Sequence, residues 1–345
     1  MKKLLLSFML FGIMSSLFSL PTLLNRKQFN VHDINDLAID LSWENLELQE
    51  CNDSSTILVE IYCNKKDYAP QLSTRGSKLV VKSKKNTGFF SRHDCTVILK
   101  LPSSKTFDVS AFRTTSGHIQ CQAFLKTNNL TVQTTSGYTS FTVPSYADIS
   151  SFDATSGNIF IDSLYGKKLQ IKATSSSIKV EKFEGDYCSV HATSGSIKLR
   201  EISSKEVYIN ATSGSITVEG DVTNSLGINA TSGTVGVELE TVPEENTMIT
   251  TTSGTIFTAF PENADYSVMV TTVSGAFINA ITGETIISSV HYKRNINEGG
   301  PFVMLTATSG RITLDSTNSF ASKTTEVTEN PDIPVVSFDD PIFNE

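Results

Sequence analysis

The sequence predicts an all-β protein built as a β-solenoid, and two repeating patterns predict it. The first is the tripeptide Thr-Ser-Gly, which occurs eight times between Thr115 and Gly310, with degenerate copies at Thr174–Ser176 and Val273–Gly275. Successive third positions are 19 to 21 residues apart, except for a last interval of 35 residues. This period is too short for a helical hairpin or a propeller blade, and it suits one coil of a solenoid.

The second pattern is an alternation of apolar residues on both sides of each repeat. The residue four positions before each serine is apolar in all ten copies, and the residue two positions after the glycine is apolar in all but Thr139. Such a period of two predicts short strands with one face inward. The register shifts across Ser-Gly, so we expect a corner there, where glycine accepts a positive φ or a tight bend.

The expected corner residues are Ser116, Gly117, Ser136, Gly137, Ser156, Gly157, Ser194, Gly195, Ser213, Gly214, Ser232, Gly233, Ser253, Gly254, Ser309 and Gly310. Stacked coils would place equivalent residues about 4.8 Å apart. About ten coils would then carry interior ladders of Ile/Val, of Ala/Thr and of serine hydroxyls. We expect the serines to bond corner backbone groups or one another.

The chain divides into four predicted parts. Residues 1–19 combine Lys2 and Lys3 with an apolar stretch and small residues, which is typical of a secretory signal, although an N-terminal membrane anchor is the alternative. After a linker over 20–27, residues 29–105 read as strands of an N-terminal β cap. Residues 106–315 form the repeat solenoid, and residues 316–345 are an acidic tail that we expect to be disordered.

Charge and cysteine content limit the classes of partner and cofactor. The formal net charge is −8, and no Lys/Arg cluster follows a face, so nucleic acid is not an expected partner. Of five cysteines, Cys121 and Cys188 fall in inward columns, while Cys63 and Cys95 can pair in an exported protein. The pairing among Cys51, Cys63 and Cys95 stays open. There is no CxxC motif, and we expect no metal and no cofactor.

The sequence offers few candidates for catalysis. Asp153, Lys172 and His191 share one outward column, which is either a proton-transfer site or a solvated charge ladder. We favour the ladder, because glycosidases and lyases need further carboxylates or bases nearby. His118 and Tyr138 share another outward column, where they could stack on a sugar or simply decorate the surface. No catalytic motif is present, so we expect no enzyme activity.

The long interval after Gly275 contains an insertion near 281–300 that differs from the repeats in composition. It carries the consecutive residues His291, Tyr292, Lys293 and Arg294, together with a Gly/Pro-rich stretch. We expect a protruding loop there. Loops on rigid scaffolds often carry function, so these four residues are the candidate ligand or partner contacts; a flexible loop tip without a ligand is the alternative.

The repeat columns, the strand Val97–Pro102 and the segment Glu298–Gly310 resemble the DUF4097 family of candidate adhesins over about 29–315. The resemblance implies an exported or envelope protein with a right-handed parallel β-helix, and it supplies no catalytic residues. We therefore expect a non-enzymatic adhesin or cell-envelope scaffold in the periplasm or at the cell surface. Its partner would be a surface, a glycan or an envelope protein, and it would have no transmembrane domain beyond the N-terminal signal or anchor. The alternatives are an envelope-stress sensor and a glycan-processing β-helix enzyme.

Overall fold

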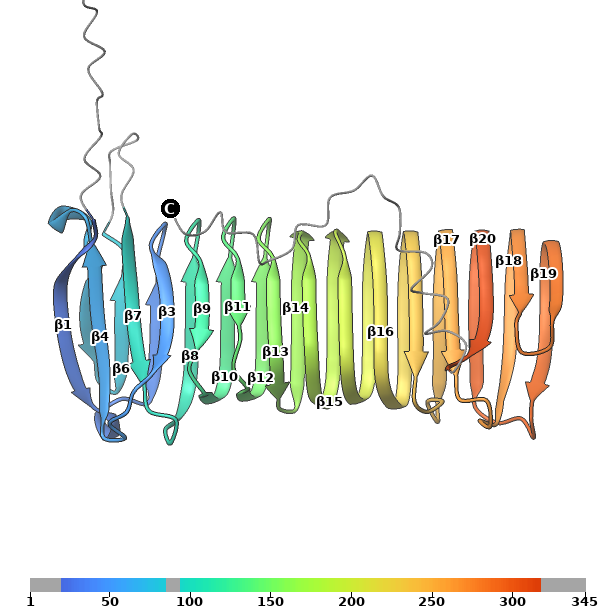
Figure 1. Ribbon diagram of the computed structural model, residues 1–345, viewed down its shortest axis with the longest axis horizontal. Coiled ribbons are helices and arrows are strands. Elements are labelled where there is room, and N and C mark those ends of the chain that lie inside the picture. The colour runs from blue at the N-terminus through green and yellow to red at the C-terminus, as the bar shows by residue number, and fades with distance from the viewer. Residues whose placement is uncertain (1–19, 85–93, 318–345) are drawn as a thin grey trace, which may run out of the picture.

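A computed structural model describes residues 20–84 and 94–317, and within them the protein is all-β. The strands stand side by side in one long row (Figure 1). The expected signal and nearly all of the acidic tail lie outside the described residues. Among the residues that are described, no helix has the length and apolar character needed to cross a membrane.

The first third of the row holds seven strands and two short 3-10 helices. They are β1 (Thr22–Asn30), η1 (Val31–Asp33), β2 (Asp36–Asp40), β3 (Asn45–Glu50), β4 (Thr56–Cys63), η2 (Lys66–Tyr68), β5 (Gln71–Arg75), β6 (Lys78–Lys82) and β7 (Cys95–Leu101). Strand β1 overlaps the expected linker at 20–27, so that expectation is wrong: the segment pairs antiparallel with β4. The predicted strands near Ile57, Leu79 and Thr96 are confirmed.

The repeats form the rest of the row. Their strands are β8 (Thr106–Thr114), β9 (Ile119–Gln122), β10 (Leu125–Thr134), β11 (Thr139–Phe141), β12 (Ser145–Ala154), β13 (Ile159–Tyr165), β14 (Lys168–Ser175), β15 (Ile178–Ser194), β16 (Ile197–Leu239), β17 (Asn246–Phe260), β18 (Tyr266–Asn279), β19 (Glu284–Ile296) and β20 (Phe302–Ser316). Strand β16 contains two Thr-Ser-Gly motifs, so it continues around corners.

Parallel pairing between equivalent positions of successive repeats builds the row. Val132 of β10 lies opposite Phe112 of β8 on one side and Phe152 of β12 on the other. The same register continues from β12 through β14, β15 and β16 to β17. Each repeat is therefore stabilised by its neighbours along the row, as in other repeat proteins.

The predicted alternation sets the core. All ten residues four positions before the serine are buried: Phe112, Val132, Phe152, Ile171, Val190, Ile209, Ile228, Ile249, Val270 and Leu305. The column after the glycine is buried as well, including Thr139. Cys121 and Cys188 are fully buried, as expected. Along one strand, Ile209 is buried and Asn210 is exposed, which confirms the period of two.

The serines do not lie inside, and this part of the prediction is wrong. Ser116, Ser136 and Ser156 are exposed, because the corner turns them outward. Their expected bonding is found at other corners: Ser213 Oγ donates to the Thr193 carbonyl at 3.4 Å, and the Ser253 and Ser309 hydroxyls lie 3.3 Å apart. The serine ladder thus holds neighbouring corners together from the solvent side.

The glycines are required mainly by close approach between repeats. A Cβ atom at Gly137 would lie 1.7 Å from the Gly117 carbonyl oxygen, which no side chain can accommodate. Gly214 adds a φ of 124° to the same close contact, and that conformation is rare for other residues. At the degenerate corner, Ser176 is buried and its hydroxyl has no hydrogen-bond partner among the described residues.

The order of strands departs from the order of repeats at both ends of the row (Figure 1). Near the N-terminus, β2 lies between β6 and β8, and β3 lies between β7 and β9. Near the other end, β20 lies between β17 and β18. Antiparallel strands stand outside these: β4 and β1 beyond β7, β5 beyond β6, and β19 beyond β18.

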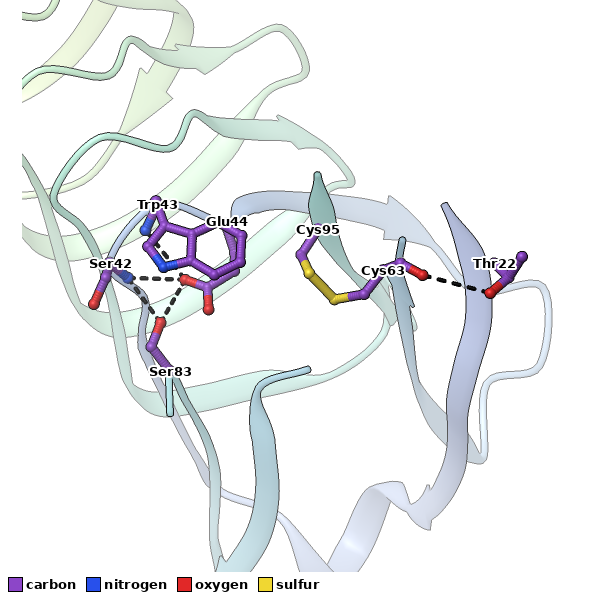
Figure 2. Close-up of a disulfide and its surroundings, with 7 residues drawn as sticks. All are labelled: Thr22, Ser42, Trp43, Glu44, Cys63, Ser83 and Cys95. Carbon is purple, nitrogen blue, oxygen red and sulfur yellow. Dashed lines mark hydrogen bonds between the residues drawn. A yellow bond between two sulfur atoms is a disulfide. The ribbon is translucent and has the colours of Figure 1, made fainter. Parts of the chain in front are cut away.

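The N-terminal strands are fastened by a disulfide and a buried carboxylate (Figure 2). Cys63 and Cys95, directly opposite in β4 and β7, form the disulfide, which resolves the open pairing; Cys51 is half-buried and free. Glu44 is fully buried, and its Oε2 accepts hydrogen bonds from the backbone N–H groups of Ser42 and Trp43 and from the Ser83 hydroxyl. These contacts hold the turn that leads into β3.

Candidate functional site: a polar groove along the repeats

A groove of about 700 Å³ runs across the repeats from β12 to β17, perpendicular to the strands. Three consecutive positions of each repeat line it, since the residues three and one before the serine point outward. The first wall is formed by Asp153, Lys172, His191, Asn210, Asn229 and Thr250. The second wall is formed by Thr155, Thr174, Thr193, Thr212, Thr231 and Thr252.

Between the two walls, the backbone of an alanine column lines the groove, while the alanine side chains face the core; the column is Ala154, Ala173, Ala192, Ala211 and Ala230. The groove extends one repeat beyond the last alanine, to Thr250 and Thr252. The column itself continues with Thr134 on one side and Thr251 on the other. Both of these threonines are buried. The groove thus has backbone between its walls, and the walls carry hydroxyl, amide and charged groups.

One end of the first wall is charged and the other is neutral. Asp153 Oδ2 accepts a hydrogen bond of 3.1 Å from Gln133 Nε2, and Gln133 Oε1 accepts one of 2.8 Å from Arg113 Nε. Lys172 and His191 follow in register and are exposed, and Lys172 forms no ion pair with any residue that the structure describes. With one carboxylate and one ammonium, this end of the wall carries little net charge.

At the neutral end, the two asparagines form an amide ladder. Asn229 Nδ2 donates to Asn210 Oδ1 at 3.2 Å. Both side chains are exposed, so the amide atoms that this bond does not use can meet a ligand. An amide offers two donors and an acceptor, and each threonine hydroxyl both donates and accepts. The neutral end can therefore bind groups of either hydrogen-bonding type.

The structure brings together the three residues that the sequence had aligned. Asp153 lies opposite Lys172, and Lys172 lies opposite His191. The expected alignment of the three residues in one column is therefore confirmed. Asp153 is the single carboxylate among the described residues of the groove. The arrangement offers hydrogen bonding along a line and does not present the paired carboxylates of a glycosidase.

The four residues predicted on a loop lie instead on strand β19, so the loop expectation is wrong. The insertion pairs antiparallel with β18 over most of its length. The Tyr292 hydroxyl donates to Glu284 Oε2 at 2.9 Å, and Arg294 forms an ion pair with the same carboxylate at 2.9 Å. Lys293 Nζ lies 5.7 Å from the centre of the Phe302 ring, and His291 is exposed. Tyr292 and Arg294 thus contact Glu284, whereas Lys293 lies near Phe302, so the four residues do not form one cluster.

His118 and Tyr138 stack on each other. Their ring centres are 3.9 Å apart, Tyr138 N–H donates to His118 Nδ1, and Gln120 Nε2 donates to the Tyr138 hydroxyl. Partial burial lowers the pKa of His118, and burial, with the charge of Glu47, raises the pKa of Tyr138. Since the facing sides of the two rings are occupied by each other, this pair is a surface contact between repeats.

Metal binding has no support in the geometry of the described part of the chain. Within residues 20–84 and 94–317, no three His, Cys, Asp or Glu side chains gather closely enough to hold an ion. The thiols of Cys121 and Cys188 are fully buried, and burial raises the pKa of each to about 12, so they stay protonated. They pack as small apolar side chains.

The family model described as Toastrack DUF4097 matches residues 34–187 and 167–315, which together cover most of the chain. The chain belongs to this family. The matched ranges include strands β2 to β7, all the Thr-Ser-Gly repeats and the whole groove, so the Toastrack domain of this protein contains the candidate site. The comparison with curated proteins gives no significant match.

Several solved structures are similar to this Toastrack protein at low sequence identity. A candidate adhesin from Parabacteroides merdae is 12% identical, with 83% of this chain and 95% of that chain covered and a TM-score of 0.43. A candidate lipid binding protein from Parabacteroides distasonis is 14% identical, with 83% and 96% covered and a TM-score of 0.46. A candidate adhesin from the same species is 11% identical, with 84% and 96% covered and a TM-score of 0.41.

Proposed function

We propose that the protein is an exported, non-enzymatic adhesin or cell-envelope scaffold that uses the groove as its binding surface. The observation that carries the proposal is the continuity of the groove over six register-linked repeats. A ligand in this groove would contact walls whose spacing is set by backbone hydrogen bonds, so the binding surface is rigid before the ligand arrives. Such preorganisation lowers the entropic cost of binding.

The fold behind this surface is, in our proposal, a right-handed β-solenoid of about ten coils with residues 29–105 as an N-terminal cap. The regular parallel register supports the coils, and the antiparallel strands β1, β4 and β5 support the cap, since they cover the first parallel edges. The disulfide supports export, because such bonds persist in oxidising compartments. Periplasm and cell surface are both consistent with it.

The direct test is retention on isolated bacterial envelope material. Purified wild-type protein should be retained, and Asn210→Ala/Asn229→Ala should be retained at least about tenfold more weakly, because two neutral hydrogen bonds of about 1 kcal/mol each correspond to about thirtyfold in affinity. Ser215→Ala/Thr234→Ala is the matched control, since both residues are exposed on the same strand, β16, and lie outside the groove. Equal retention of both double variants would refute the groove as the binding surface.

The enzyme alternative is tested with the same material. Release of reducing or unsaturated sugar ends by wild-type protein, and its loss in Asp153→Asn, would show a glycan-processing enzyme. We expect no release, since Asp153 has no second carboxylate beside it in the groove.

A partner-binding module is the second candidate function, and strand β19 favours it. Within the described residues β19 pairs with β18 alone, and it carries Lys293, Arg294 and the 76% exposed Ile287. A free strand edge with basic and apolar side chains can accept a partner. If this surface acts, Lys293→Ala/Arg294→Ala should weaken retention and the groove variants should not.

A further inference from the structure

We infer that the ligand of the groove is a neutral, linear polysaccharide that lies along the row of repeats; the inference rests on the proposed function. The groove crosses six equivalent positions, so it is about 24 Å long at the usual spacing of about 4.8 Å between strands. Its open sides and even walls admit a chain that continues beyond both ends. A linear polymer therefore fits this surface better than a compact small molecule.

The charge of the lining favours a neutral polymer. Among the described residues that line the groove, Asp153 and Lys172 offset each other, and the remaining walls are His191, asparagine and threonine. Binding of nucleic acid or of a polyanionic glycan depends on several Lys or Arg side chains along the path. This groove offers one, so it gives no electrostatic advantage to a polyanion.

The direction of the groove argues against an extended peptide. Peptides commonly bind to sheets by adding a strand at a free edge, where backbone N–H and C=O groups are available. Here the strands under the groove are paired on both sides, so their backbone groups are already used. The residues of an extended peptide in the groove would be spaced ~3.3 Å apart, whereas the wall residues are spaced ~4.8 Å apart. The backbone groups of the peptide could therefore not align with successive wall side chains.

The chemistry of the walls matches sugar hydroxyls. Each threonine hydroxyl and each asparagine amide both donates and accepts, as does every hydroxyl of a sugar ring, so several ring orientations can be satisfied. The alanine column adds no polar side chain between the walls, so the hydrogen bonds to a sugar ring come from the wall residues. The Asn210–Asn229 ladder is the part of the wall richest in free donors, and we assign it the main contacts.

The test is calorimetric titration of full-length protein with neutral cello-, xylo- and N-acetylchito-oligosaccharides of increasing length. At least one series should bind, and its affinity should rise with length until the oligomer spans about 24 Å, then level off. Asn210→Ala/Asn229→Ala should reduce the affinity for the longest oligomer at least about tenfold. Ser215→Ala/Thr234→Ala should leave it within about twofold, and circular dichroism should show both variants folded.

Three outcomes would overturn the inference. They are no binding of any neutral series, affinity that does not depend on length, and stronger groove-dependent binding of oligogalacturonate or of an extended Ser/Gly peptide. If envelope retention depends on the groove while no neutral oligosaccharide binds, the ligand class is wrong and the proposed function stands. If the groove variant is retained on envelope material as strongly as wild-type protein, the proposed function itself fails.

Discussion

At the scale of the residue, neighbouring positions on one strand face opposite environments. Ile216 is 1% exposed in the ladder of the core, whereas Thr217, the next residue, is half-exposed. Ile216→Asp should lower the free energy of unfolding by at least about 3 kcal/mol, because it buries an unpaired charge. Thr217→Asp should change it by less than about 1 kcal/mol. Denaturant unfolding of the two variants checks this, and equal losses would contradict the alternation.

The cysteines give a second prediction at this scale. Cys121 and Cys188 are fully buried, and burial raises their pKa to about 12, so neither thiolate is available near neutral pH. Native protein should therefore react with iodoacetamide at Cys51 alone, and unfolded, unreduced protein should react at all three free thiols. Mass spectrometry counts the labels. Rapid native labelling of Cys188 would mean that the repeats around β15 open easily.

At the scale of the element, the position of β20 is the feature that the sequence did not predict. The serine columns continue through Ser253, Ser274 and Ser309, and a sequential stack would place Ser274 beside Ser253. The structure places Ser309 beside both. Because every repeat presents the same inward pattern, the pattern determines which residues are buried and leaves open which repeat is the neighbour.

A pair of crosslinking variants tests this order. Ser253→Cys/Ser309→Cys should form a disulfide under mild oxidation, because adjacent strands hold equivalent residues about 4.8 Å apart, within the range for a disulfide. Ser253→Cys/Ser274→Cys should not, since two strand spacings separate the residues by about 10 Å. Non-reducing peptide mapping identifies the bond. The opposite pattern would restore the sequential order.

The insertion at 281–300 shows the limit of composition as a guide to structure. Its charges, glycines and proline are typical of a loop, yet most of it is strand β19. The reason is its position at the end of the row, where β18 has an edge to be covered and Val290 and Ile296 can be buried. Neither effect is visible without knowing which strand comes last.

At the scale of the whole molecule, the sequence predicted the outward columns but not the groove. Asp153, Lys172 and His191 were correctly aligned in an outward column. That the two walls enclose a hollow over the alanine column depends on the shape of the stacked sheet, which the pattern of one repeat does not contain. The signal that was available is the run of alanines between Thr134 and Thr251.

In our proposal, the groove and not the end strand β19 recognises the ligand. The most direct measurement compares the affinities of Asn210→Ala/Asn229→Ala and Lys293→Ala/Arg294→Ala for the same immobilised envelope material, with wild-type protein alongside. We expect a loss of at least about tenfold for the asparagine variant and a change within about twofold for the β19 variant. The reverse result, with full affinity in the asparagine variant and weak binding in the β19 variant, would contradict the proposal and move the binding surface to β19.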